Sequence, residues 1–190
     1  MTFNDLCNKH GTDKGNEVRE QHCYSYTYEK IFTPFENKKI NILEIGIADP
    51  LFPGASLKVL SEYFPKANII GFDIVDCSHF NIDRVKTIKG DAGCKEDVLS
   101  ILKVQPEFDI IIDDGSHLHD HHMNCFLNLF SSVKKGGLYI IEDLQAPTSE
   151  KTTNYFFNDD NKDIVKGCGV KKIELYNYGK LLTLYNEKPK

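Results

Sequence analysis

Acidic residues and one histidine stand at the ends of two short apolar runs, and these residue types could bind a divalent metal ion and move a proton. Asp114 and His117 follow the first run, and Glu142 and Asp143 close the second. Three carboxylates held close together repel one another unless a cation lies between them. Oxygen ligands suit Mg²⁺ and, less specifically, Mn²⁺ or Ca²⁺. We therefore predict Asp114, Glu142 and Asp143 as metal ligands, with Asp114 and His117 as the catalytic residues and the His117 imidazole as general base.

Three further histidines follow His117 closely, at positions 119, 121 and 122. From His119 onward the pattern predicts a helix, on which consecutive side chains point in different directions. We therefore predict no zinc or iron site there, and we expect His119 and His122 to be solvated or to cap the helix. His121 lies four residues after His117, and whether it faces the same cleft is left open.

A second group of candidates lies at the ends of the earlier predicted strands, where an open α/β sheet binds its ligands. Gly46 allows a ligand to approach the backbone, Asp73 could accept both hydroxyls of a ribose, and Asp91 could face an adenine. The phosphate-binding pattern G-x-G-x-x-G is absent, which favours a nucleoside ligand without a pyrophosphate, such as S-adenosylmethionine, over NAD. Ser56 is also a predicted helix cap, and Asp113 could instead bond a neighbouring backbone N–H. The candidate cofactor contacts at these strand ends are Glu44, Gly46, Gly54, Ser56, Asp73, Asp91 and Asp113.

The elements that position these residues alternate along the chain. Near-continuous apolar runs indicate strands covered on both faces, and the segments between them have helical spacing. We predict an α/β fold, a doubly wound, mostly parallel, seven-stranded Rossmann-like sheet that ends in an antiparallel hairpin around Asn177–Lys180. The predicted strands are Ile40–Ile45, Asn68–Asp73, Arg84–Ile88, Phe108–Asp113, Leu138–Glu142, Val170–Tyr176 and Leu181–Asn186. The predicted helices are Tyr24–Phe35, Ser56–Phe64, Lys95–Val104 and His119–Val133, the last stopping at Lys134–Gly137.

Composition excludes several classes of partner. The 190 residues carry a net charge of −5 and no basic cluster, so we expect neither nucleic acid nor an anionic membrane as a partner. No apolar run approaches the ~18 residues of a membrane span, and the N-terminus lacks the apolar core of a secretory signal. The six scattered cysteines predict reduced thiols and a cytoplasmic location.

Several of these motifs together resemble a known family. The string IIDDGSH at 111–117, then His121, F-x-x-LF and GGLYIIED, resembles the metal-dependent class I methyltransferases that O-methylate sugars of macrolide antibiotics, as in the mycinamicin and macrocin pathways. HGTDKG at 10–15, followed by His22, Tyr24 and Tyr28, resembles their N-terminal segment. LEIGI and GASL, with FP and GFDI downstream, resemble their cofactor loop. The likeness covers residues 10–145.

This resemblance implies a fold, two cofactors and a set of roles. It implies S-adenosylmethionine and Mg²⁺ as cofactors and methylation of a carbohydrate hydroxyl, on a small-molecule sugar or nucleotide-sugar. Residues 1–36 would form an N-terminal helical and lid segment, and 37–190 the methyltransferase domain. The implied Mg²⁺ ligands are Asp114, Glu142 and Asp143, with His117 as base. The implied cofactor contacts are Glu44, Gly46, Asp73 and Asp91, with Thr12, Asp13 and Lys14 in the cofactor lid.

Other functions stay open at this point. The same fold could act on a catechol-like or phosphorus-containing acceptor, and a distant likeness to the cephalosporin-hydroxylase group shares the DD-x-SH and ED patterns. A non-catalytic nucleotide-binding or assembly protein is a further alternative. The segment 144–169 is short and polar, which indicates an open acceptor pocket or one completed by another subunit, so a homo-oligomer is left open.

Overall fold

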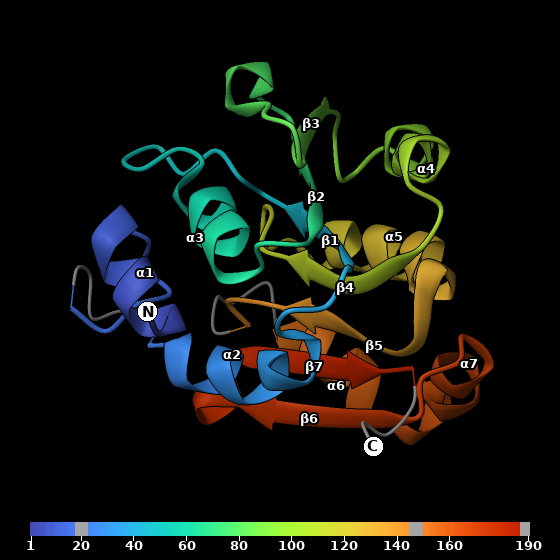
Figure 1. The fold of residues 1–190 in the computed structure, drawn as a ribbon. Helices are drawn as coiled ribbons and strands as arrows, with labels where there is room; N and C mark the ends of the chain where they lie inside the picture. Colours follow the sequence, from blue (N-terminus) through green and yellow to red (C-terminus); the bar gives the residue numbers. More distant parts are fainter. Residues whose placement is uncertain (18–22, 145–149, 187–190) are drawn as a thin grey trace.

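A seven-stranded sheet forms the centre of the computed structural model, which describes residues 1–17, 23–144 and 150–186 (Figure 1). Within these residues the strand order is β3-β2-β1-β4-β5-β7-β6. The first five strands pair in parallel, and β7 is antiparallel to both β5 and β6. The predicted α/β sheet with a C-terminal antiparallel hairpin is therefore confirmed. The strands are β1 Asn41–Ile45, β2 Asn68–Asp73, β3 Val85–Lys89, β4 Phe108–Asp113, β5 Val133–Ile141, β6 Lys172–Tyr176 and β7 Leu181–Tyr185.

Helices cover both faces of the sheet (Figure 1), and the central strands are apolar on both sides. In β1, for example, Ile42 packs into one core and Leu43 into the other. The helices are α1 Phe3–His10, α2 Ser25–Phe32, α3 Ala55–Tyr63, α4 Lys95–Val104, α5 His119–Leu129, α6 Glu150–Phe157 and α7 Lys162–Gly167. Short 3-10 turns are η1 Thr33–Phe35, η2 Ser78–Phe80, η3 Phe130–Ser132, η4 Asp159–Asn161 and η5 Asn177–Gly179.

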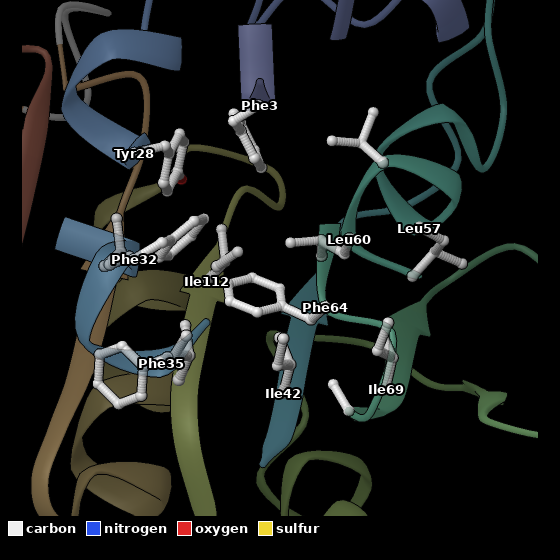
Figure 2. Packing of buried hydrophobic residues seen from close by; sticks show 14 of the residues in the cluster. Phe3, Tyr28, Phe32, Phe35, Ile42, Leu57, Leu60, Phe64, Ile69 and Ile112 are labelled. Atoms are coloured by element: carbon white, nitrogen blue, oxygen red, sulfur yellow. The ribbon is translucent and has the colours of Figure 1, made fainter. Parts of the chain in front are cut away.

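The N-terminal helices share one core with the sheet. Figure 2 shows Phe3, Tyr28 and Phe32 facing Phe64 and Ile112 across this core. The α1 helix begins with a capping box between Thr2 and Asp5 and ends at Gly11, whose φ of +79° closes the helix in the left-handed conformation. The chain then runs directly from α1 toward the carboxyl ends of the strands, which is where its Thr12–Lys14 segment lies.

The boundary between α5 and β5 differs from the prediction. The helix ends at Leu129, and Lys134–Gly137 lie inside β5 rather than beyond a helix end. Lys134 Nζ lies 2.9 Å from Asp109 Oδ2 on β4, and a side chain at Gly137 would meet the Asp109 carbonyl oxygen at 2.7 Å. Lys134–Gly137 fall where the register between β4 and β5 shifts, and contacts with Asp109 account for a cation and a glycine that also suit a helix C-terminus.

The segment 144–169 contains more structure than its polar composition indicates. Its described part forms α6, η4 and α7, which bury Thr152, Phe156 and Val165 against α5 and the sheet. No helix in the described ranges 1–17, 23–144 and 150–186 combines the length and apolar character needed to cross a membrane.

Candidate metal and cofactor site

A pocket of about 370 Å³ opens at the carboxyl ends of the central strands. It brings together most of the predicted site residues, although they come from six separate segments of the chain. Those lining it are Thr12, Asp13, Lys14, Gly46, Ser56, Asp73, Asp91, Asp114, His117, His121 and Asp143. Glu44, Gly54, Asp113 and Glu142 do not line it.

Gly46 makes the floor of this pocket possible. It has φ +85°, and a side chain there would place its Cβ 2.0 Å from the carbonyl oxygen of Asp114. The end of β1 can therefore approach the end of β4 only with glycine at this position. The sequence predicts that a ligand approaches the backbone at Gly46, and the structure shows that a neighbouring strand does so. Both need a residue without a side chain at this position.

Asp73 holds the loop that follows β1. Its Oδ2 accepts hydrogen bonds from the backbone N–H groups of Ile47 at 2.8 Å and Ala48 at 2.9 Å. Its Oδ1 accepts one from Val75 N at 2.9 Å. The carboxylate thus shapes one wall of the pocket, in addition to its predicted role toward a ribose.

Glu44 lies behind the pocket rather than in it. The side chain is fully buried, and burial raises its pKa to about 7. Its Oε2 accepts a 2.9 Å hydrogen bond from Ser56 Oγ, while Oε1 has no partner. The prediction that Ser56 caps a helix is wrong, because α3 begins at Ala55 after Gly54, and no side chain caps it. Ser56, which lines the pocket, lies between Glu44 and the predicted cofactor site.

Asp113 is likewise turned away from the pocket. It is buried, and Tyr139 donates a 2.9 Å hydrogen bond to its Oδ2. Burial raises the pKa of this carboxyl to about 7. Of the two consecutive aspartates, only Asp114 faces the site.

Asp114, His117 and Asp143 form the group that fits a metal ion. One ligand atom from each lies within 4.8 Å of the other two. His117 Nε2 is 3.7 Å from Asp143 Oδ2, and Tyr24 donates a 2.6 Å hydrogen bond to Asp143 Oδ1. Both His117 and Asp143 have φ +57°, a left-handed conformation that is uncommon for non-glycine residues, although Asp and His adopt it more readily than most. Two carboxylates with a nearby imidazole are a donor set that suits a divalent cation.

The predicted ligand Glu142 stands beside this group and is engaged by two other residues. Lys14 Nζ lies 2.9 Å from Glu142 Oε2, and the Tyr28 hydroxyl donates to Oε1. The same Lys14 Nζ lies 2.5 Å from Asp114 Oδ2. Burial raises the pKa values of Glu142 and Asp114. Burial alone would lower the pKa of Lys14, but the Asp114 and Glu142 carboxylates raise it well above its usual range, so the ammonium stays charged.

Sequence reasoning missed these contacts from the N-terminal segment. Lys14 was expected in a cofactor lid, and although it lines the pocket, its ammonium lies among the carboxylates. Tyr24 and Tyr28 were named in the resemblance without a role, and the structure shows that each hydroxyl bonds an acidic residue after β5. Spacing along a helix shows which face is buried, but not that a buried tyrosine ends at a carboxylate. His22, named in the resemblance, lies outside the described residues.

The histidines of α5 divide differently from the prediction. His122 is buried, not solvated, with Nδ1 3.3 Å from Thr152 Oγ1 and Nε2 without a partner. Burial lowers its pKa to about 3. His119 Nδ1 lies 3.1 Å from the same Thr152 oxygen. Both histidines therefore contact α6 through Thr152. His121 does face the pocket, with Nδ1 2.8 Å from Ser116 Oγ.

Comparison with known proteins agrees with this geometry. No protein-family model matches the chain. It is 39% identical over 126 residues to mycinamicin VI 2''-O-methyltransferase of Micromonospora griseorubida, covering 65% of this chain and 32% of that protein. It is 36% identical over 144 residues to 8-demethyl-8-alpha-L-rhamnosyl tetracenomycin-C 2'-O-methyltransferase of Streptomyces olivaceus, covering 74% of this chain and 37% of that one. The chain is similar to sugar O-methyltransferases of antibiotic biosynthesis.

The fold comparison extends over the whole chain. The MycE methyltransferase of the mycinamycin pathway, solved with Mg, SAH and mycinamycin VI, superposes with a TM-score of 0.83 at 26% identity, covering 100% of this chain and 56% of that one. The class I methyltransferase fold and the resemblance inferred from the motifs are thereby confirmed. The chain spans about a third of the length of the curated relatives that it matches.

Proposed function

We propose that the chain is an S-adenosylmethionine-dependent, metal-assisted O-methyltransferase that acts on a hydroxyl of a sugar or sugar-bearing small molecule. One observation carries this proposal: the Asp114, His117 and Asp143 group faces the same pocket as the strand-end residues predicted to hold the cofactor. The fold neighbour MycE, solved with Mg and SAH, supports the pairing of these two cofactors.

The two cofactors divide the chemistry between them. When bound, S-adenosylmethionine supplies a methyl group activated as a sulfonium, and a divalent ion acidifies and orients an acceptor hydroxyl. Gly46, Ser56, Asp73 and Asp91 would hold the nucleoside cofactor. Asp114 and Asp143 would hold the ion, and Glu142, the predicted third ligand, stands beside them.

The protein's own residues then have three tasks. His117 Nε2, 3.7 Å from Asp143 Oδ2, takes the proton from the acceptor hydroxyl, and the carboxylate stabilises the imidazolium that forms. Tyr24 keeps Asp143 in place through its hydrogen bond to Oδ1. Ile45, Ile47, Ala48 and Phe72 line the apolar part of the pocket and exclude water from the reaction.

The proposal also covers the acceptor molecule and the cellular location of the protein. We expect a small sugar or nucleotide-sugar acceptor and a cytoplasmic location. The relatives named above act on rhamnosyl tetracenomycin-C and mycinamicin VI, so glycosylated small molecules are the first acceptors to test.

A labelled-methyl transfer screen tests the proposal. The chain would be incubated with S-adenosylmethionine carrying a radioactive methyl group, Mg²⁺, and separate panels of nucleotide-sugars, glycosylated small molecules and catechols. We expect label in the sugar-bearing panels. Label in catechols alone would move the activity to a non-sugar acceptor. Calorimetric binding of S-adenosylmethionine with no effect of Mg²⁺, and no transfer to any panel, would favour a non-catalytic binding protein.

A further inference from the structure

Lys14 places a buried positive charge between two of the predicted metal ligands. The side chain reaches from the turn after α1 to the ends of β4 and β5, residues 100 and 128 positions away in the sequence. Its Nζ lies 2.5 Å from Asp114 Oδ2 and 2.9 Å from Glu142 Oε2, and only 4% of the residue is exposed. No other Lys or Arg in the described residues contacts either carboxylate.

This ammonium has a clear task in the metal-free protein. A buried charge is unfavourable unless it is paired, and two carboxylates side by side repel each other. The Lys14 ammonium meets both conditions at once, since its Nζ contacts Oδ2 of Asp114 and Oε2 of Glu142. The sheet can therefore bring Asp114 and Glu142 together without a metal ion.

The same contacts stand in the way of a metal ion. Asp114 belongs to the ion pair with Lys14 and also to the group that fits a metal. Both carboxylate oxygens of Glu142 are engaged, Oε2 by Lys14 and Oε1 by Tyr28, so an ion that binds Glu142 through Oε2 competes with the Lys14 ammonium. An ion bound to Asp114 would also be repelled by an ammonium held on the neighbouring oxygen of the same carboxylate.

We propose that Lys14 is a placeholder cation: it holds Asp114 and Glu142 in the metal-free protein, and a divalent ion binds by displacing its ammonium from these carboxylates. The displacement weakens metal binding and so keeps the site reversible. Because Lys14 and its neighbours Thr12 and Asp13 line the same pocket as the predicted cofactor contacts, displacement of the ammonium also changes the surroundings of the cofactor. The inference rests on the proposed function only in taking a divalent ion as the ligand.

Calorimetric titration with Mg²⁺ tests this directly, with no acceptor present. The Lys14→Met variant keeps the apolar stem and removes the charge, so we expect it to bind Mg²⁺ about tenfold or more tightly than the wild type. Lys9→Met is the matched control, since Lys9 pairs with Glu62 on the surface, 2.7 Å away, and its Mg²⁺ affinity should equal that of the wild type. Equal or weaker binding by Lys14→Met would overturn the proposal.

A second measurement uses the wild type and covers the case in which the variant does not fold. An amine-reactive reagent, read out by mass spectrometry, should leave Lys14 unlabelled without Mg²⁺ and label it at saturating Mg²⁺. Lys9, with 49% of its side chain exposed, should be labelled in both conditions. Protection of Lys14 that persists at saturating Mg²⁺ would show that no displacement occurs.

These readouts separate the inference from the proposed function. If Lys14→Met binds Mg²⁺ more tightly but no acceptor is methylated, the methyltransferase proposal fails and the placeholder role stands. If neither the wild type nor Lys14→Met binds Mg²⁺, the placeholder role and the metal part of the function both fail.

Discussion

Asp143 serves the site through its backbone and its side chain. Its φ of +57° turns the carboxylate toward His117, and Tyr24 holds one of the two oxygens. Asparagine tolerates this backbone conformation and can still accept the hydrogen bond from Tyr24, so Asp143→Asn removes mainly the charge. We expect more than a tenfold loss of Mg²⁺-stimulated turnover, the order seen when the surroundings of a metal are disturbed, with S-adenosylmethionine affinity unchanged in calorimetry.

A matched control for this substitution lies on the surface of α5. Asp120 is exposed, and Asp120→Asn should leave turnover at the wild-type level. If Asp143→Asn retains full Mg²⁺-stimulated turnover, the carboxylate is not part of the metal site.

His117 is where the roles of base and ligand can be separated. Asparagine again suits its φ of +57°. If His117 is the general base, His117→Asn should lower turnover by about 10²–10⁴-fold, and this variant should keep the wild-type Mg²⁺ affinity in calorimetry. His119→Asn, on the α6 side of the helix start, should be nearly neutral for turnover. A parallel fall in Mg²⁺ affinity for His117→Asn would instead make His117 the third ligand in place of Glu142.

At the scale of single residues, the sequence predicts the site residues that directly follow the end of a strand. Asp114 and Asp143 meet because the carboxyl ends of parallel neighbours share one edge of the sheet. The sequence could not show that Lys14 enters between Asp114 and Glu142, since that contact depends on how the N-terminal segment folds back. The burial of His122 was missed for a similar reason, because it depends on α6.

Among the elements, the loop after β1 depends on β2 through Asp73. The Asp73→Ala variant removes the acceptor of the Ile47 and Ala48 amides. We expect faster hydrogen exchange at these two amides and S-adenosylmethionine affinity lower by about tenfold or more, since a hydrogen bond to a charged group contributes about 1.5–3 kcal/mol. Asp76→Ala, which removes a similar turn bond to Ser78, is the control. Unchanged exchange and affinity in Asp73→Ala would contradict this account.

The packing of α6 on α5 gives the protein a pH-dependent stability through His122. Burial lowers the pKa of His122 to about 3, against about 6.5 for an unfolded histidine. As the pH falls from 6.5 toward 3, the unfolded chain binds the proton first, so stability is lost in that window. At pH 4.5 the loss attributable to this residue is about 2–3 kcal/mol. The titratable groups that act on its imidazole are His117, His119, His121 and Asp143.

Urea denaturation at pH 7 and pH 4.5 measures this effect. His122→Gln removes the titrating group, so its midpoint should fall less between the two pH values than that of the wild type. His79→Gln, at an exposed position, should behave as the wild type does. An equal fall for His122→Gln and the wild type would assign the acid sensitivity to other residues.

For the elements, the sequence predicts best those strands that are buried on both faces, because burial on both faces leaves a near-continuous apolar run in the sequence. The central strands are buried on both faces and are predicted to within a residue or two at most ends. The start of β5 was missed because Lys134–Gly137 also suit a helix end, and only contacts with Asp109 on β4 decide between the two. The helices α6 and α7 were missed because few of their residues are buried.

For the whole molecule, the N-terminal segment and the sheet are bound by one apolar core. Phe3, Tyr28 and Phe32 pack with strand residues such as Ile42 and Ile112 (Figure 2). The same segment supplies Lys14 and Tyr24 to the carboxylates at the strand ends. Described residues of the N-terminal segment therefore contribute both to the site and to the core, and the action of this segment as a lid stays a prediction.

The metal dependence of methyl transfer tests the central claim most directly. An acceptor identified in the labelled-methyl screen would be incubated with S-adenosylmethionine and protein pretreated with EDTA, before and after Mg²⁺ is added back. The account predicts that transfer is lost after EDTA treatment and restored by Mg²⁺, while calorimetric binding of S-adenosylmethionine persists throughout. Transfer at the full rate by the EDTA-treated protein would contradict a metal-assisted reaction at Asp114, His117 and Asp143.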